Sequence, residues 1–228
     1  MYLLVTGFYA FLSHLDYLYA AVAAYLCGCF NGALFTSRLF FHDDVRTHGS
    51  GNAGLTNFYR TYGAKYALGV ILFDMGKTVI ACLIGGAAFD YLAGDWMLGV
   101  LLGGLGCELG HMFPVFFGFK GGKGVLVGVS VFLGIDWKVF LCLIVIFAVV
   151  LAISKYVSLG SIVASVCCPI VTFLFQFWQR GDLPMWYLWL NTGLAALMGA
   201  WVIWMHRTNI QRLRAGNENK FSFHSKKA

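Results

Sequence analysis

Long apolar stretches alternate with short polar segments along the whole chain. A helix needs about 20 consecutive, mostly apolar residues to cross the hydrocarbon core of a bilayer. The pattern predicts helices at residues 17–40, 66–89, 97–117, 125–135, 139–153, 159–177 and 185–205. We therefore expect an all-α polytopic membrane protein with about seven transmembrane helices.

The predicted helix at 125–135 differs from the others, because its 11 residues fall short of the 17 or so that a crossing helix needs. Two arrangements fit such a stretch. It can tilt beside a thinned region of the bilayer, or it can be re-entrant, so that the chain leaves the membrane on the side where it entered.

The composition is typical of a membrane protein and excludes a soluble one. Apolar residues make up 60% of the 228 residues and charged residues 11%, whereas soluble domains have about 45–50% and about 25%. The helices leave no room for a separate soluble domain, so we expect residues 1–228 to form a single integral-membrane domain. The seven cysteines lie in apolar stretches without metal-ligand spacing, and we expect no metal and no cofactor.

The basic residues predict how the helices are oriented. With seven crossings, four polar segments share one side, at 41–65, 118–124, 154–158 and 206–228. Thirteen of the sixteen lysines and arginines lie in or beside these segments, and only Lys138 and Arg180 face the other side. Because positive charge is concentrated in cytoplasmic loops, we expect the C-terminus in the cytoplasm and the N-terminus outside.

The first of these segments has the composition of a phosphate-binding loop. Glycines alternate in it with Ser50, Asn52 and Asn57, and it ends near Arg60. Glycine lets the backbone turn its N–H groups inward, hydroxyl and amide side chains add donors, and an arginine binds an anion with two parallel hydrogen bonds. The alternative is an ordinary glycine-rich turn with solvated polar groups.

The segment at 118–124 is a second candidate anion site. It contains Lys120, Gly121, Gly122 and Lys123. A glycine-rich turn that leads into a helix supplies free N–H groups and the positive end of the helix dipole, and Lys123 adds a charge. The segment lacks the nucleotide-binding pattern G-x-x-x-x-G-K-[ST], since Gly124 follows Lys123, which disfavours an ATPase. The alternative is basic side chains that reach lipid headgroups.

Two further segments carry polar side chains at the predicted membrane surface. Ser158 and Ser161 begin the helix at 159–177, where a hydroxyl caps a helix or binds an anion equally well. His206 and Asn209 are three residues apart and share a helix face, from which they can bind a hydroxylated substrate. A basic stop-transfer tail explains Arg212, but it leaves the histidine and the asparagine unexplained.

Ionisable residues also lie inside predicted helices, where they are costly and point to function. Glu108 is a candidate functional residue for this reason. For Asp74 and Lys77, three residues apart, we expect mutual neutralisation that holds helices together, and for His111 a structural role.

Four ordered motifs together suggest a family. They are Gly49-Ser50-Gly51-Asn52-x-Gly54-x-Thr56-Asn57-x-x-Arg60, Gly110-His111-x-Phe113-Pro114 followed by Gly121-Gly122-Lys123-Gly124, Tyr156-x-Ser158-Leu159-x-Ser161, and His206-Arg207-x-Asn209-Ile210 with Gly216-x-Glu218. The set resembles the bacterial acyl-phosphate-dependent glycerol-3-phosphate acyltransferase family (PlsY), over a core at residues 24–221. The family's usual Gly-Ser-Ile-Pro is replaced by Gly28-Cys29-Phe30-Asn31 in the first predicted helix.

The resemblance implies an enzyme of the bacterial inner membrane with its active site facing the cytoplasm. It would transfer a fatty acyl group from acyl phosphate to glycerol 3-phosphate, giving lysophosphatidic acid and phosphate, the first committed step of phospholipid synthesis. Lys123, His206 and Glu218 would be catalytic. The implied substrate-binding residues are Ser50, Asn52, Asn57, Arg60, Lys120, Gly121, Gly122, Ser158, Ser161 and Asn209. Expected partners are the two substrates, membrane lipid and an acyl-phosphate-forming enzyme, with no nucleic acid.

The chemistry of an acyl phosphate agrees with the residues present. It is an activated mixed anhydride, so no serine nucleophile is needed, and no G-x-S-x-G motif occurs. The sequence also lacks an H-x-x-x-x-D pair. The proton acceptor stays open between His206 and a substrate phosphate. A transporter or channel for a phosphorylated anion is the alternative function.

Overall fold

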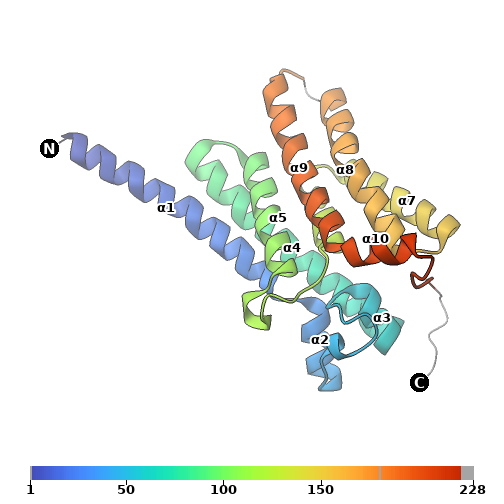
Figure 1. Cartoon of the computed structure of the whole chain (residues 1–228). Coiled ribbons are helices and arrows are strands. Elements are labelled where there is room, and N and C mark those ends of the chain that lie inside the picture. The colour runs from blue at the N-terminus through green and yellow to red at the C-terminus, as the bar shows by residue number, and fades with distance from the viewer. Residues whose placement is uncertain (1, 180, 222–228) are drawn as a thin grey trace.

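The structure is a computed structural model that describes residues 2–179 and 181–221, and this part of the chain is all-helical (Figure 1). The helices are α1 (Tyr2–Cys29), α2 (Gly32–Phe41), α3 (Leu55–Tyr62), α4 (Ala64–Ala93), α5 (Trp96–Met112), α6 (Val125–Ile135), α7 (Trp137–Ser154), α8 (Val157–Gln179), α9 (Met185–Met205) and α10 (Arg207–Arg214), with short 3₁₀ turns η1 (Val45–Thr47) and η2 (Val115–Phe117). Arg180, placed by the sequence on the outer side, lies outside the described residues, as does the end of the tail.

Within the described residues, five helices are long and apolar enough to cross a membrane, namely α4, α5, α7, α8 and α9. The pair of α1 and α2 makes a sixth if it is counted as one bent span. Helix α6 is too short by the same criterion. The structure therefore confirms an all-helical, multi-span membrane protein, and it reduces the predicted seven crossings to five or six candidates.

The single helix predicted at 17–40 is wrong, because the chain breaks after Cys29 and turns by 43° before α2. Asn31 causes the new start: its side-chain oxygen accepts a hydrogen bond from the Leu34 N–H at 3.0 Å and so caps α2. Its amide nitrogen donates to the Ala53 carbonyl at 2.9 Å. The break therefore ties the first membrane segment to the glycine-rich loop.

A buried ion pair in α4 stabilises the chain between α1 and α2. The Lys77 ammonium lies 2.8 Å from the Asp74 carboxylate and donates to the carbonyls of Gly28 and Phe30, at 3.2 and 2.8 Å, at the end of α1. Asp74 accepts from the free N–H of Gly32 at 3.0 Å, at the start of α2. The expected mutual neutralisation is confirmed, and the pair also satisfies helix-terminal groups that would otherwise be unpaired in the membrane.

Helix α5 packs at close range against α4 and α1. A Cβ atom on Gly85 of α4 would lie 2.2 Å from the Gly99 carbonyl oxygen, and one on Gly110 would lie 2.0 Å from the Tyr25 carbonyl oxygen. Membrane helices gain little from hydrophobic exclusion of water, so small residues that allow backbone contact stabilise their packing.

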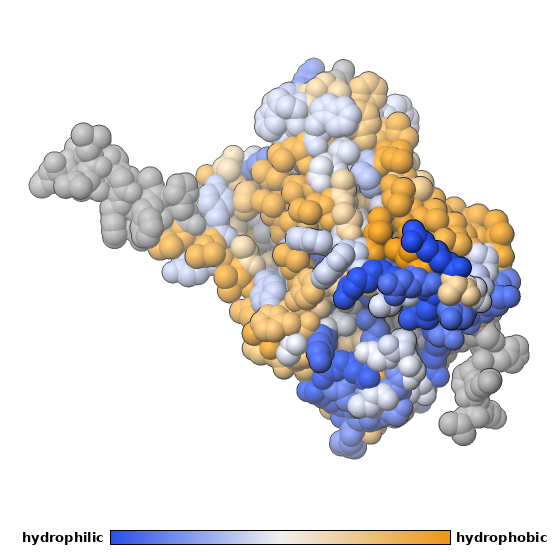
Figure 2. Space-filling model, viewed as in Figure 1, coloured by the Kyte–Doolittle hydropathy of each residue, from blue (hydrophilic) through white to orange (hydrophobic). Residues whose placement is uncertain are grey.

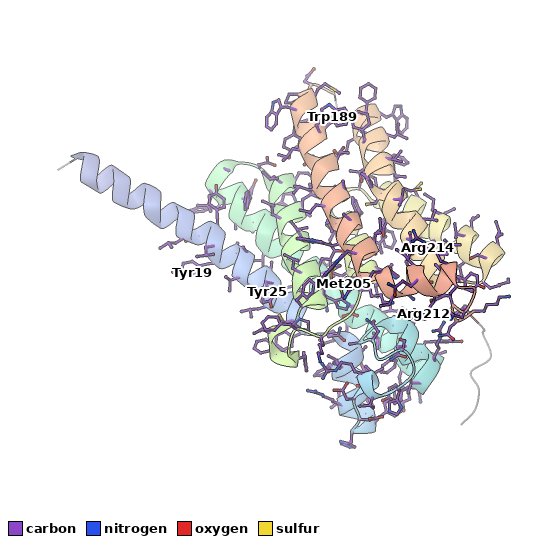
Figure 3. The ribbon with its side chains drawn as sticks, in the orientation of Figure 1. Tyr19, Tyr25, Trp189, Met205, Arg212 and Arg214 are labelled. Atoms are coloured by element: carbon purple, nitrogen blue, oxygen red, sulfur yellow. The ribbon has the colours of Figure 1, made fainter. Side chains whose placement is uncertain are left out.

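The bundle has two distinct ends. Hydrophilic residues gather over α2, α3 and α10, while hydrophobic residues cover the helices that extend away from them (Figure 2). Trp189 lies near the opposite end from Arg212 and Arg214 (Figure 3). That opposite end also has its own hydrogen bonds, such as Tyr187 to Asp95 at 2.6 Å.

Candidate active site

A cavity of about 350 Å³ lies between the polar loops and helices α6 to α9. Its polar lining includes Ser50, Asn52, Asn57, Arg60, Lys123, Ser158, Ser161, His206, Asn209, Arg212 and Glu218, together with Asp74 from α4 and Glu108 and His111 from α5. The fold thus brings most of the sequence-predicted residues to one place. Deeper in, the lining becomes mainly apolar, with Leu126, Val129, Phe132, Leu143, Ile144, Phe147, Ala164, Cys168, Met198 and Val202.

Lys123 and the start of α6 form the cationic part of this site. Gly124 has φ of +81°, a backbone conformation that favours glycine, and no side chain in the described chain caps the helix. The first-turn N–H groups therefore have no partner in α6 and can bind an anion. Burial, together with the positive charges of Arg212 and Arg60, lowers the pKa of Lys123 to about 8.

Glu218 links helices α8 and α10 beside Lys123. Its carboxylate accepts hydrogen bonds from Asn209 Nδ2 at 2.7 Å, Ser158 Oγ at 2.9 Å and Arg212 Nε at 2.6 Å. Burial raises the pKa of Glu218, but these three hydrogen bonds and the arginine charge outweigh it and bring the pKa below its usual value. The carboxylate is therefore charged at neutral pH. Asn209 in turn accepts a hydrogen bond from the Lys123 ammonium through Oδ1.

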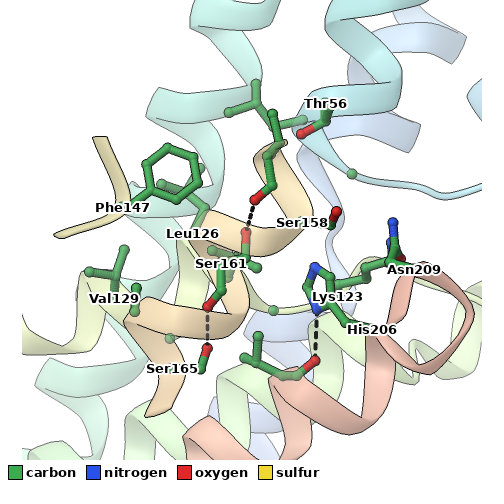
Figure 4. Close-up of a pocket in the computed structure, with 18 of the residues that line it drawn as sticks. Thr56, Lys123, Leu126, Val129, Phe147, Ser158, Ser161, Ser165, His206 and Asn209 are labelled. Carbon is green, nitrogen blue, oxygen red and sulfur yellow. Dashed lines mark hydrogen bonds between the residues drawn. The ribbon is translucent and has the colours of Figure 1, made fainter. Parts of the chain in front are cut away.

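His206 ends α9 and is only 3% exposed. Its Nδ1 donates to the Val202 carbonyl at 2.8 Å, which leaves Nε2 as a hydrogen-bond acceptor. Burial and the nearby Lys123 charge lower the pKa of His206 to about 4, so the imidazole is neutral near pH 7. His206, Lys123, Asn209 and Ser158 lie close together, with Leu126, Val129 and Phe147 on the other side of the pocket (Figure 4).

Asn57 organises the glycine-rich loop. It is 3% exposed, and its amide nitrogen donates to the carbonyls of Val45, His48 and Asn52 at 2.9 to 3.0 Å. Its side-chain oxygen accepts from the Ser50 N–H at 2.9 Å. The side chain is therefore occupied within the loop, and it holds Ser50 and Asn52 at the cavity.

Arg60 and Arg212 make the polar end of the cavity cationic. Arg60 Nη2 donates to the Asn219 carbonyl at 3.4 Å. Burial lowers the pKa of Arg60, partly offset by Glu218, but an arginine stays charged at any physiological pH. With Lys123, these arginines outnumber the Glu218 carboxylate around the described cavity mouth, which favours an anionic ligand.

The rest of the lysine loop lies outside the cavity lining. Lys120 is exposed, and its carbonyl accepts from Arg46 at 3.2 Å. The N–H groups of Gly121 and Gly122 donate to the carbonyls of Met112 and His111, at 3.2 and 3.0 Å. A Cβ atom on Gly122 would lie 2.1 Å from His111 Nε2, so this glycine is needed for the loop to approach α5.

The sequence profile of the family described as "Glycerol-3-phosphate acyltransferase" matches residues 18–216, most of the chain. The chain belongs to this glycerol-3-phosphate acyltransferase family. Acyltransferases of that description include one from a Thermoanaerobacter species, 38% identical over 200 residues, which covers 88% of this chain and 93% of the relative. Another, from Fusobacterium nucleatum, is 38% identical over 202 residues and covers 89% and 96%.

Two solved structures of an acyltransferase share this fold. A crystal structure of PlsY, an integral membrane glycerol 3-phosphate acyltransferase, in its glycerol 3-phosphate form has a TM-score of 0.73 and 36% identity, covering 90% of this chain and 96% of that chain. The lysophosphatidic acid form has a TM-score of 0.72 and 34% identity, covering 92% and 97%.

Arg212 lines the cavity, although a basic stop-transfer tail was enough to explain it from the sequence alone. Its guanidinium pairs with the Glu218 carboxylate at 2.6 Å. The signal was present, because Arg212 follows Asn209 by three residues and therefore shares its helix face. Thr56 also lines the cavity and was quoted only as part of a motif.

Proposed function

We propose that the chain transfers a fatty acyl group from acyl phosphate to glycerol 3-phosphate in this cavity. The observation that carries the proposal is a cationic, hydrogen-bonding mouth on a deep apolar cavity. The mouth fits the phosphates of both substrates, and the apolar part fits a hydrocarbon chain. Family membership favours this enzyme over a transporter or channel.

The reaction needs no covalent enzyme intermediate. A hydroxyl oxygen of glycerol 3-phosphate attacks the acyl carbonyl carbon and forms the ester bond. The bond between that carbon and the phosphate oxygen breaks, and phosphate leaves with the electron pair. The hydroxyl proton ends on a phosphate oxygen. The protein then has to neutralise phosphate charge, stabilise the developing oxyanion and orient the hydroxyl group.

The cationic groups take the phosphates in this proposal. Lys123 and the N-terminus of α6 bind the leaving phosphate and stabilise the charge that develops on it, and Arg60 and Ser50 bind the second phosphate, with Asn52 beside them. Ser158 and Ser161, at the start of α8, contact the acyl phosphate. These roles are supported by the position of each side chain on the cavity lining.

His206 and Asn209 orient the glycerol in this proposal. The neutral His206 offers Nε2 as an acceptor to the attacking hydroxyl group. With a pKa of about 4, the imidazole is a weak base, whereas a phosphate group with a pKa near 6 accepts a proton more readily. We therefore assign the proton to a substrate phosphate.

Glu218, Asn57, Gly121 and Gly122 act as positioning residues in this proposal. Glu218 aligns Asn209 and Ser158, Asn57 shapes the first loop, and the glycines bring the second loop against α5. Lys120, which is exposed, would attract anionic substrates over a longer range rather than touch them.

We further propose a seven-crossing topology, with the C-terminus and the active site facing the cytoplasm of a bacterial cell. Helix α6 supports it, because it leads from Lys123 at the polar end to Asp136 at the other end. There, the Asp136 carboxylate accepts from Gln179 at the end of α8, at 2.6 Å. The 11 residues of α6 would then complete a crossing with the help of a locally thinned or protein-enclosed path.

The remaining proposals concern the domain organisation of the chain and the source of its acyl phosphate. Residues 1–228 act as one integral-membrane domain with a family core at 24–221, and no cofactor, metal or nucleic acid takes part. Acyl phosphate hydrolyses easily and partitions into lipid, so an acyl-phosphate-forming enzyme has to deliver it at the membrane.

The test is incubation of the purified protein with palmitoyl phosphate and glycerol 3-phosphate. Formation of lysophosphatidic acid, with one phosphate released per ester formed, is the expected result. Uptake of glycerol 3-phosphate into proteoliposomes without ester formation would instead support the transporter.

A further inference from the structure

Glu108 is a buried carboxyl group that the proposed reaction does not use. It lies in α5 with 0% exposure, and neither carboxyl oxygen has a hydrogen-bond partner among the described residues. A buried polar group without a partner is unfavourable and uncommon in folded proteins. The structure therefore leaves Glu108 with a hydrogen-bonding capacity that a ligand can satisfy.

Glu108 is one of the cavity-lining residues, and its carboxyl group packs against the start of α6. Glu108 lines the cavity together with the apolar residues of α6 and α8. Its Oε1 lies 3.0 Å from the position of a Cβ atom on Gly124 and 2.8 Å from that on Gly128. These two glycines are one helical turn apart, a rise of about 6 Å. The carboxyl group is thus beside the first turn of α6, immediately beyond Lys123.

In the proposed reaction, this position would lie beside the first few carbons of the acyl chain. If Lys123 holds the leaving phosphate, the chain passes the first turn of α6 on its way to Phe132 and Met198 deeper in the cavity. A saturated chain would place methylene groups against Glu108 and leave the carboxyl group unpaired. A hydroxyl group can donate to it and accept from it.

We propose that the cavity is selective for acyl phosphates that carry a hydroxyl group close to the carbonyl, a 3-hydroxyacyl phosphate above all, and that Glu108 is the residue that selects them. This inference rests on the proposed acyl transfer and narrows its donor. A site built to pair with a substrate hydroxyl group discriminates against an analogue without it, because the protein group then stays unpaired. For one buried hydrogen bond, we expect a preference of about tenfold or more.

The experiment is a competition between two donors on the purified, full-length protein. Equal concentrations of 3-hydroxyhexadecanoyl phosphate and hexadecanoyl phosphate react with glycerol 3-phosphate, and mass spectrometry gives the ratio of the two lysophosphatidic acids. Because both products form in one tube, the ratio is independent of how much protein is folded. A third donor with its hydroxyl group at carbon 12 tests position, and it should behave as the unsubstituted chain.

Variants of Glu108 test whether this residue determines the ratio of the two lysophosphatidic acids. Glu108→Leu should reduce the preference to about one, whereas Glu108→Gln, which keeps a donor and an acceptor, should retain a preference for the hydroxylated donor. Met198→Leu is the matched control, because it changes the shape of the same cavity without changing its polarity, and it should keep the wild-type ratio.

Equal products from the wild type would overturn the inference, and so would an unchanged preference in Glu108→Leu or a complete loss of it in Glu108→Gln. In these cases acyl transfer itself would stand, since product forms. No product from either donor would contradict the proposed acyl transfer and this inference with it. A tenfold preference that Glu108→Leu removes would establish the role of the residue.

Discussion

Replacement of Glu218 by alanine tests whether the carboxylate aligns the site. The variant would lose the hydrogen bonds from Asn209, Ser158 and Arg212. A hydrogen bond to a charged group contributes about 1.5–3 kcal/mol. If the transition state depends on one of them, the bond to Asn209, the expected loss in kcat/KM is about 10-fold to 150-fold. Glu218→Gln keeps an acceptor for Asn209 and should lose less.

The assay is formation of lysophosphatidic acid from palmitoyl phosphate and glycerol 3-phosphate, with the variant's thermal unfolding measured in parallel. Asp136→Ala is the matched control, since Asp136 accepts hydrogen bonds from Lys138 and Gln179 at the other end of the bundle. It should cost about 0.5–2 kcal/mol of stability as a lost helix cap while leaving kcat/KM of the folded protein nearly unchanged. A folded Glu218→Ala variant with wild-type kcat/KM would refute the alignment role.

Three further predictions concern topology and pH. A cysteine at Arg60 should be labelled only from the cytoplasm and one at Asp182 only from outside, and the opposite pattern would contradict the orientation. Lys123 must be protonated to bind phosphate, and its pKa is lowered to about 8. We therefore expect kcat/KM to fall above that pH in the wild type and to stay level in Lys123→Arg. A flat wild-type pH profile would disprove this role of Lys123. His206→Asn should raise the KM for glycerol 3-phosphate and keep the fall in kcat toward acid pH that protonation of a substrate phosphate causes. Loss of this fall in the variant would make His206 the base.

Local patterns predicted much of the site from the sequence. The glycine-rich loop, the lysine before a short helix, and the spacing of His206 and Asn209 each have a physical meaning within a few residues of chain. The pairing of Asp74 and Lys77 could be predicted in the same way, because a three-residue spacing on a helix brings both groups together. The ordered motifs were needed to predict that these parts belong to one site.

Other features depend on contacts between distant segments and could not be predicted. The break at Asn31 leaves little trace in the sequence, because one polar residue barely changes the hydropathy of a long apolar stretch. Its side chain is held by the Ala53 carbonyl of a later loop. That Glu108 has no hydrogen-bond partner among the described residues is a property of the packing around it. The close packing of Gly122 against His111 also depends on a contact between distant segments.

The donor preference of the purified protein tests the central claim most directly. Palmitoyl phosphate, palmitoyl-CoA and palmitoyl-acyl carrier protein are each offered with glycerol 3-phosphate, to the wild type and to Lys123→Ala. We expect lysophosphatidic acid from the acyl phosphate alone, and a rate about 150-fold lower in the variant, which corresponds to about 3 kcal/mol of lost transition-state stabilisation. Comparable rates with either thioester, or an unchanged rate in Lys123→Ala, would contradict the account.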